Sequence, residues 1–368
     1  MNVLSLFDGK SSGFTACELA GIEVGTYYSA EIDKYAIQVS NAIHPNQTRL
    51  GSVTEWRDWD IEWASIDMIF GGFPCQAWSM AGKQLGDKDE RGMLFWTMLD
   101  IMKHVRKHNP DVQFLIENVK MKKEFEEYIT HHMAEAVGDV HKILINSALV
   151  SAQNRNRYYW TSFEVAQPKD RGIHINEILE IPGRVGSMIG RKINPQTGKR
   201  DDYNSNIETV QRIELRGDNK TNTLTTVTKD NLVVDEKFFI SQKQLDRLDL
   251  SSVKDGGARV CFQSPGQNIE KSECLQARDY KGVSGRQYFT VAMVGGRLRK
   301  LTPRECFRLQ TVPEHYIDKI LDCGVSNTQL YKIAGNGWTD EVIAHILRCM
   351  PSEKSSNINR IRKLLNKG

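Results

Sequence analysis

A cysteine that follows two glycines and a proline is the residue of this sequence best suited to covalent chemistry. Cys75 stands in Gly71-Gly72-Phe73-Pro74-Cys75-Gln76, directly after the apolar run Ile66–Phe70. That run has the pattern of a buried strand, and the two glycines end it abruptly. Open α/β sheets carry their chemistry at the carboxyl ends of strands. A thiol presented there indicates a nucleophile, with proteases and redox enzymes among the classes that use one.

An acid and two arginines follow other strand-like segments. Glu117 closes the apolar run Val112–Ile116 and begins Glu-Asn-Val, whereas Arg155 and Arg157 lie in Gln-x-Arg-x-Arg between two strand candidates. Each alone is typical of a strand end or of a surface pair. Brought to one sheet edge, an acid can donate a proton and arginines can hold an anionic group. Their meaning therefore depends on whether the fold brings them together.

The N-terminal segment has the spacing of a nucleotide-binding unit. Val3–Phe7 is a strand candidate, a glycine turn follows with Gly9 and Gly13, and Glu31 ends a second strand 22 residues after Gly9. In such units the acid at the second strand's end binds a ribose. The turn lacks the Gly-x-Gly-x-x-Gly of a pyrophosphate site. The pattern thus favours a nucleoside ligand without phosphates, with an ordinary turn as the alternative.

Regular alternation of strand and helix patterns predicts the scaffold that positions these residues. It indicates an α/β fold with a doubly wound, mostly parallel sheet. The expected strands are Val3–Phe7, Val24–Glu31, Gln47–Val53, Ile66–Phe70, Val112–Ile116, Lys142–Val150 and Arg157–Phe163. The expected helices are Phe14–Ala20, Asp33–Ile43, Glu55–Ala64, Met93–Arg106, Lys120–Met133, Pro303–Leu309, Asn327–Ile333 and Trp338–Met350.

A change in amino-acid composition and in helical periodicity predicts an inserted domain. Residues 168–297 are rich in glycine, turn residues and short β-like runs, so we expect a smaller, loop-rich β domain there. The catalytic domain would then comprise 1–167 and 298–350, followed by a basic tail at 351–368. Residues 184–300 hold 21 Lys and Arg against 14 Asp and Glu, a balance of +7, whereas the whole chain carries +3. A polyanion partner and a solvated basic surface both fit that charge.

Composition limits the class of protein. The 368 residues are 40% hydrophobic and 26% charged, as in soluble globular proteins. Seven scattered cysteines without a Cys-x-x-Cys pair indicate free thiols rather than disulfides or a zinc site. No apolar run reaches the roughly 18 residues of a membrane span, and the N-terminus lacks an apolar leader. We expect a cytoplasmic monomer that contacts no membrane.

The motifs, taken in order, resemble those of the cytosine-C5 DNA methyltransferase family, of bacterial or phage type. The first motif is also similar to that of vertebrate de novo methyltransferases. The resemblance covers most of the chain and rests on Phe7-Asp8-Gly9 with Gly13, Gly72-Phe73-Pro74-Cys75-Gln76, Glu117-Asn118-Val119, Gln153-x-Arg155-x-Arg157, Leu301–Gln310 and Gly335-Asn336-Gly337. It implies the Rossmann-like fold of class I S-adenosylmethionine-dependent methyltransferases, with residues 168–297 as the target-recognition domain.

The resemblance implies a covalent mechanism. Cys75 would add to C6 of cytosine, which makes C5 nucleophilic toward the methyl group of S-adenosylmethionine. Glu117 would donate a proton to N3 if an apolar strand end raises its pKa. Arg157 and Arg155 would hold the O2 atom and nearby phosphates. No metal is needed.

The family's cofactor and DNA contacts carry over to matching positions. Ser52 stands where the family often has an aspartate that contacts the adenine amino group. The cofactor residues implied are Phe7, Gly9, Gly13, Glu31, Ser52, Val53, Pro74, Leu94, Asn336 and Trp338. The DNA contacts implied are Gln76, Ser79, Lys83, Gln84, Thr223, Leu224 and Arg278.

Three functions remain open for the sequence. Because the target base must leave the stack, residues 79–92 would close behind a flipped cytosine in double-stranded DNA. The same chemistry acts on RNA in tRNA-modifying relatives, but these have a much reduced recognition region. A catalytically dead DNA-binding module is the third, and intact Cys75, Glu117 and Arg157 speak against it.

Overall fold

The computed structural model describes most of the region predicted to be catalytic and part of the predicted insert. The described residues are 1–74, 90–180, 184–194, 196–197, 200–215, 272–273, 289–294, 297–299 and 301–351. Several predicted site residues lie outside them: Cys75, Gln76, Ser79, Lys83, Gln84, Thr223, Leu224 and Arg278.

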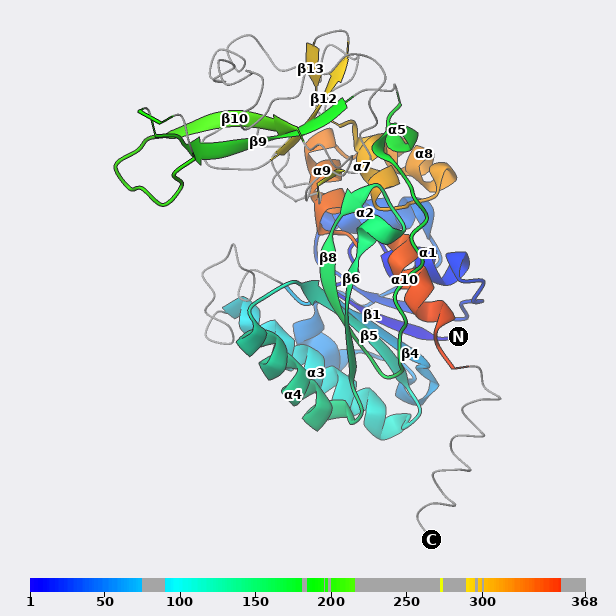
Figure 1. Cartoon of the computed structure of the whole chain (residues 1–368). Coiled ribbons are helices and arrows are strands. Elements are labelled where there is room, and N and C mark those ends of the chain that lie inside the picture. Colours follow the sequence, from blue (N-terminus) through cyan, green and yellow to red (C-terminus); the bar gives the residue numbers. More distant parts are fainter. Residues whose placement is uncertain are drawn as a thin grey trace.

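A seven-stranded sheet in the order β3-β2-β1-β4-β5-β8-β6 forms the centre of the molecule (Figure 1). β8 runs antiparallel to both of its neighbours, and every other pair in the sheet is parallel. The α/β fold with a mostly parallel sheet is therefore confirmed. The strands are β1 (Val3–Leu6), β2 (Tyr27–Ala30), β3 (Thr48–Arg49), β4 (Met68–Gly71), β5 (Gln113–Val119), β6 (His141–Asn146) and β8 (Asn156–Thr161).

Helices cover both faces of this sheet because its strands are apolar on both sides. Leu4 of β1 belongs to the core with α3 (Glu90–His108) and α4 (Lys123–Val137). Its neighbour Val3 points the other way, into the core with α1 (Ser12–Leu19) and α10 (Asp340–Arg348). The sheet is thus the middle of three layers (Figure 1).

A third apolar core holds five helices together above the sheet in Figure 1. Thr302 begins one of them with a capping box, because its hydroxyl accepts the N–H of Glu305 while the Glu305 carboxylate accepts its N–H. The helix at 314–322 was not predicted from the sequence. These helices are α2 (Lys34–Ile43), α5 (Ile175–Ile178), α7 (Pro303–Leu309), α8 (Glu314–Asp322) and α9 (Asn327–Asn336).

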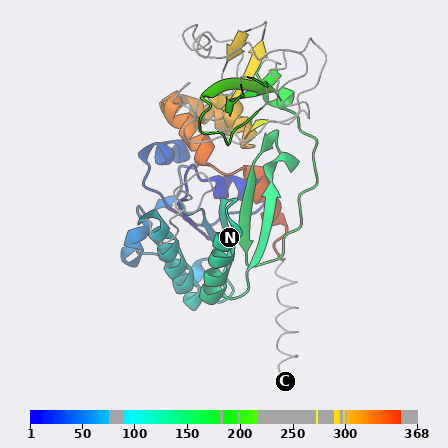
Figure 2. The same cartoon turned by 60° about the vertical axis from the view of Figure 1, so that its left-hand side comes forward.

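A smaller sheet lies beyond these helices, at the opposite end from α3 and α4 (Figure 2). Its order is β10-β9-β12-β13, and neighbouring strands run antiparallel. Its strands are β9 (Arg184–Lys192), β10 (Thr209–Leu215), β12 (Phe289–Val294) and β13 (Arg297–Arg299). A separate two-residue pair joins β7 (Gln153–Asn154) to β11 (Ser272–Glu273).

The helix predicted at Glu55–Ala64 is wrong. Two short 3₁₀ turns replace it, η1 (Val53–Asp58) and η2 (Trp63–Ser65), with extended backbone at Trp59 between them. The tryptophan spacing that suggested a helix reflects packing of the rings on one another. Trp59 and Trp63 stack with centroids 6.2 Å apart, and Trp56 meets Trp63 edge-on.

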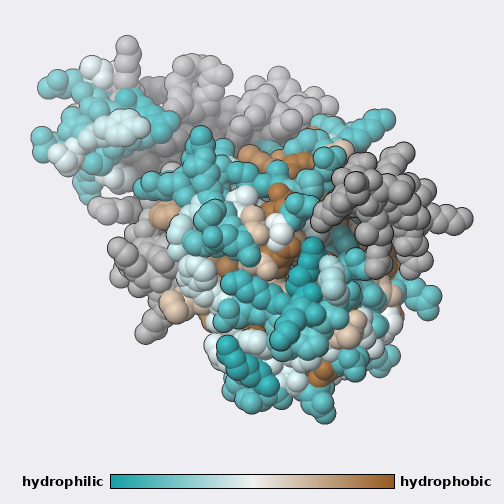
Figure 3. All heavy atoms as spheres, turned by 90° about the horizontal axis from the view of Figure 1, so that it is seen from below, coloured by the Kyte–Doolittle hydropathy of each residue, from teal (hydrophilic) through white to brown (hydrophobic). Residues whose placement is uncertain are grey.

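The described surface has no extended apolar face in the view from below. Figure 3 shows a mostly hydrophilic surface there, with apolar residues in small separate groups. Among the described helices, none combines the length and the apolar composition that a membrane crossing requires.

Candidate active site

A pocket of about 300 Å³ opens at the carboxyl edge of the sheet. The strand order reverses next to β1, and ligands of doubly wound sheets bind at such a switch point. β8 runs antiparallel, so its first residues reach the same edge. Of the predicted site residues, the pocket brings together Phe7, Gly9, Glu31, Pro74, Glu117, Arg155, Arg157, Asn336 and Trp338.

The turn after β1 has an unusual backbone. Phe7, Gly9 and Ser11 all have positive φ, at 58°, 59° and 63°, a conformation that costs free energy for a residue with a side chain. Asp8 stabilises the turn from the protein interior, because its buried carboxylate accepts hydrogen bonds from the hydroxyls of Ser11 and Tyr27. The turn is therefore held close to the pocket in a fixed shape.

Glu31 is fixed by backbone donors on both oxygens. Its Oε2 accepts the N–H of Gly9 at 2.8 Å, and its Oε1 accepts those of Ile32 and Asp33 at 2.7 and 2.8 Å. The carboxylate thus joins the ends of β1 and β2 at the pocket wall. Ile32, which the sequence did not single out, is 75% exposed although it is a large apolar residue.

Glu117 and Arg157 form the ionic centre of the pocket. The Arg157 Nε lies 3.0 Å from the Glu117 Oε1, and both side chains are mostly buried. Asn118, the next residue of β5, donates its side-chain N–H to the carbonyl of Phe73 at 3.1 Å. This bond fixes the backbone that leads through Pro74 to Cys75. The acid, the cation and the start of the cysteine loop thus share one site.

Arg155 is buried and turned toward the backbone at the end of α9. Its guanidinium donates to the carbonyls of Gly335 and Gly337, at 3.2 and 2.9 Å. Gln310 donates to the neighbouring carbonyl of Ala334 at 2.6 Å. These bonds shape the wall that carries Asn336.

Four predicted cofactor residues do not line the pocket: Gly13, Ser52, Val53 and Leu94. Gly13 is buried in α1, where an added Cβ would lie 2.4 Å from the Phe70 ring, so close packing alone requires glycine there. The Ser52 hydroxyl accepts the N–H of Thr54 and caps η1. The roles of all four stay predictions.

Sequence reasoning missed a buried ion pair under the pocket. The Lys10 Nζ lies 2.9 Å from both carboxylate oxygens of Asp340, and neither side chain is exposed. Burial raises the pKa of Asp340, and the charge of Lys10 opposes that rise. A lysine within the glycine turn was the available signal, but its partner is 330 residues away.

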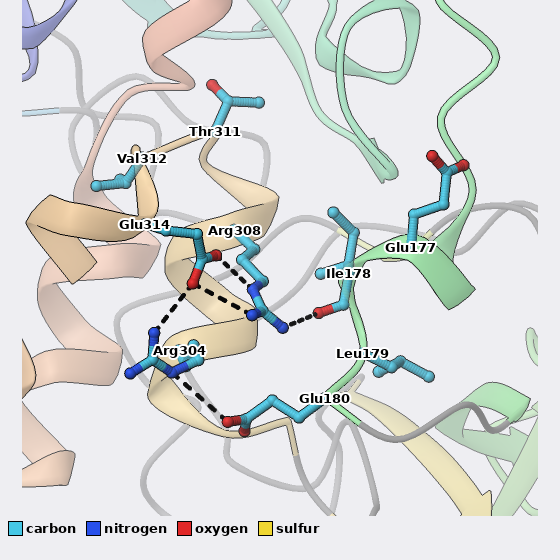
Figure 4. Close-up of a pocket in the computed structure, with 9 residues that line it drawn as sticks. All are labelled: Glu177, Ile178, Leu179, Glu180, Arg304, Arg308, Thr311, Val312 and Glu314. Atoms are coloured by element: carbon cyan, nitrogen blue, oxygen red, sulfur yellow. Dashed lines mark hydrogen bonds and ion pairs between the residues drawn. The ribbon is translucent and has the colours of Figure 1, made fainter. Parts of the chain in front are cut away.

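A second cavity, of about 780 Å³, lies between α5, α7 and α8 (Figure 4). Arg308 donates to Glu314 at 2.5 Å and to the Ile178 carbonyl at 3.0 Å, and its hydrogen bond lowers the pKa of Glu314. Arg304 pairs with Glu314 at 3.0 Å and with Glu180 at 3.5 Å. The contacts of Arg308 with Ile178 and of Arg304 with Glu180 connect the first part of the predicted insert to the helix that follows it. These ion pairs satisfy one another, which favours a structural role.

Comparison with known proteins shows which family the chain resembles. The family model described as C-5 cytosine-specific DNA methylase matches residues 1–352. The Type II methyltransferase M1.ScrFI of Lactococcus lactis subsp. cremoris is 30% identical over 339 residues, which cover 89% of this chain and 71% of the relative. The orphan methyltransferase M.SPRI of Bacillus phage SPR is 26% identical over 432 residues, covering 95% and 97%.

Solved structures show the same fold at low identity. The Entamoeba histolytica methyltransferase EhMeth superposes with a TM-score of 0.63 at 14% identity, over 95% of this chain and 97% of that one. This similarity supports the three-layer architecture.

Proposed function

The chain belongs to the C-5 cytosine-specific DNA methylase family and is a DNA (cytosine-5-)-methyltransferase, and we propose that it methylates C5 of a flipped cytosine in duplex DNA through a covalent Cys75–C6 intermediate. The observation that carries this proposal is the shared pocket. Glu117, Arg157 and the loop that leads to Cys75 all open into it.

The pocket's residues fit S-adenosylmethionine, which supplies an activated methyl group on a sulfonium. Glu31 offers a carboxylate for ribose hydroxyls at the end of β2, and the rigid turn at Gly9 brings backbone close to the ligand. Phe7 offers an aromatic face.

Each catalytic residue has one chemical role in this proposal. The Cys75 thiolate forms a bond to C6, and the displaced electron pair moves toward N3, where Glu117 delivers a proton. Arg157 holds the Glu117 carboxylate and the O2 atom of the base. Arg155 braces the wall at Gly335 and Gly337. After methylation a base removes the C5 proton and the thiolate leaves C6.

We further propose that residues 168–297 recognise the DNA sequence, with Thr223, Leu224 and Arg278 among their contacts. Swinging a base out of the duplex costs a few kcal/mol. The positive balance of residues 184–300 favours phosphate contacts that offset this cost. A Type II methyltransferase of a bacterium and an orphan methyltransferase of a phage are among the relatives, and we propose that this enzyme acts in the cytoplasm of a bacterial or phage-infected cell. We propose further that it is a monomer.

Transfer of a radioactive methyl group from S-adenosylmethionine to DNA tests the proposal. The wild-type protein should label duplex DNA in preference to RNA of equal length, and Cys75→Ser should reduce labelling to background. Cys323→Ser is the matched control. Cys323 is half-buried at the C-terminal end of α8, and its thiol donates to the Ile320 carbonyl, which a hydroxyl can also do. Labelling by Cys75→Ser at the wild-type rate would rule out the covalent mechanism.

Duplex DNA containing 5-fluorocytosine tests the elimination step. Fluorine at C5 cannot leave as a proton, so the enzyme should remain bound covalently to DNA sites that it methylates. Failure to form this adduct at such sites would contradict the proposed order of steps. Bisulfite sequencing of DNA from cells that express the protein would identify those sites.

A further inference from the structure

The indole of Trp338 touches the proposed catalytic acid. Trp338 lies in the short segment between α9 and α10, and its Nε1–H donates to the Glu117 Oε2 at 3.1 Å. The two residues are 221 positions apart in the sequence. The family resemblance implied an adenosine contact for Trp338, whereas the geometry directs its polar atom to the acid.

The two oxygens of Glu117 are therefore held from different sides. Arg157, at the start of β8, lies 3.0 Å from Oε1, and Trp338 binds Oε2. An ion pair at one oxygen and a hydrogen bond at the other restrict rotation of the carboxyl group about its last side-chain bond. Proton delivery requires the carboxyl within about 2.6–3.2 Å of its acceptor and correctly oriented.

The position of the indole is itself built by buried contacts. An added Cβ on Gly72 would lie 3.1 Å from the Trp338 Nε1, so glycine leaves the room that the ring occupies. The next residue, Thr339, is buried and shares hydrogen bonds with Ser147 and Gln310, at 2.9 and 3.0 Å. The Phe70 ring meets the indole edge-on, with centroids 6.1 Å apart.

We propose that Trp338 is a positioning residue for Glu117, which aligns the carboxyl group through its indole N–H for proton donation to the cytosine. The inference rests on the proposed function, because it assigns the acid's role to Glu117. It predicts an effect on the chemical step rather than on cofactor affinity. An adenosine contact predicts the reverse, because a ring that stacks on adenosine needs no N–H.

Steady-state kinetics of Trp338→Phe separates the two roles. Loss of the N–H should lower kcat on the order of 10- to 100-fold, as misplacement of a catalytic group does. The KM and the calorimetric Kd for S-adenosylmethionine should stay within about twofold of wild type, since an aromatic ring remains at position 338. Trp63→Phe, in the tryptophan cluster away from the pocket, is the matched control and should keep the wild-type kcat.

A second variant keeps the test independent of packing. 3-Benzothienylalanine introduced at position 338 has the shape of tryptophan with sulfur in place of the N–H, so it should reproduce the loss of kcat in a folded protein. An unchanged kcat in this variant, or a raised Kd for S-adenosylmethionine with unchanged kcat, would overturn the inference while leaving the proposed function intact. Absence of methyl transfer by the wild-type enzyme would overturn the proposed function and, with it, the inference.

Discussion

Removing one partner of the buried Lys10–Asp340 pair should be among the most damaging substitutions in the described part of the chain. Lys10→Met deletes the ammonium and leaves the Asp340 carboxylate fully buried without the cation that contacts both of its oxygens. Breaking a buried ion pair on one side costs about 3–5 kcal/mol. That is a large share of the roughly 5–15 kcal/mol that stabilises a typical protein.

Removing both charges should recover most of the unfolding free energy that Lys10→Met loses. In Lys10→Met/Asp340→Leu neither charge of this pair is left in the interior, and such replacements are often neutral. Asp340 also begins α10, where an acid stabilises the helix by about 0.3–1 kcal/mol. We therefore expect the double variant to lie within about 1 kcal/mol of wild type, so the coupling energy in the mutant cycle should be at least about 5 kcal/mol in magnitude.

The pH dependence of Lys10→Met provides a further check of sign. Burial raises the folded-state pKa of Asp340 above its unfolded value, so the folded state binds a proton more readily and loses stability as pH rises through that interval. Without Lys10 the rise is larger, and the deficit of the variant should shrink as pH is lowered from about 8 to 5.

Urea unfolding followed by tryptophan fluorescence and by circular dichroism measures these differences, provided that the two signals coincide. Asp340→Leu alone serves as the other single variant of the cycle. A cost below about 1 kcal/mol for Lys10→Met, or a double variant as unstable as the sum of the two singles, would refute the argument from burial.

Two further predictions concern α1, which contains Gly13 and whose Thr15 hydrogen-bonds to His44. Burial lowers the pKa of His44 to about 3, and the charge of Lys10 adds repulsion. The contribution of neutral His44 to the unfolding free energy should therefore be fully present above its unfolded pKa of 6.5 and fall by about 1.4 kcal/mol per pH unit below it. In urea unfolding, His44→Gln should lose this part of the pH dependence, and an unchanged pH dependence would contradict the prediction. Gly13→Ala should lower the unfolding free energy by about 1–3 kcal/mol, because the added Cβ would lie 2.4 Å from the Phe70 ring and 2.8 Å from the Tyr27 hydroxyl. Thermal denaturation measures this loss, and an unchanged melting temperature would show that the surrounding side chains can move to accommodate the methyl group.

Much of the fold follows from local sequence patterns. Buried strands such as Gln113–Val119 are short apolar runs, and the strand-end rule places Glu117 and Arg157 at one edge of a mostly parallel sheet. Pattern failed at Glu55–Ala64, where tryptophans at helical spacing pack on one another across two 3₁₀ turns. It also overlooked α8, although Tyr316, Ile317 and Ile320 form its buried face.

The contacts that complete the site cannot be predicted from local sequence patterns. Lys10 and Asp340 are partners across 330 residues, and Trp338 reaches Glu117 across 221. Motif resemblance identified the neighbourhood of each residue but not the atom that it binds. Arg155 illustrates this, because its place in the pocket was predicted whereas its bonds to the Gly335 and Gly337 carbonyls depend on how α9 ends.

The order in which the pocket's walls leave the ribosome has a consequence for the cell. Cys75, Glu117 and Arg157 emerge early, but residues 335–340 emerge only after the whole segment that we propose reads DNA. A nascent or prematurely terminated chain lacks the Trp338 wall and the Lys10–Asp340 pair. Synthesis from the N-terminus thus completes the pocket only after the segment that we propose chooses the DNA site has been made.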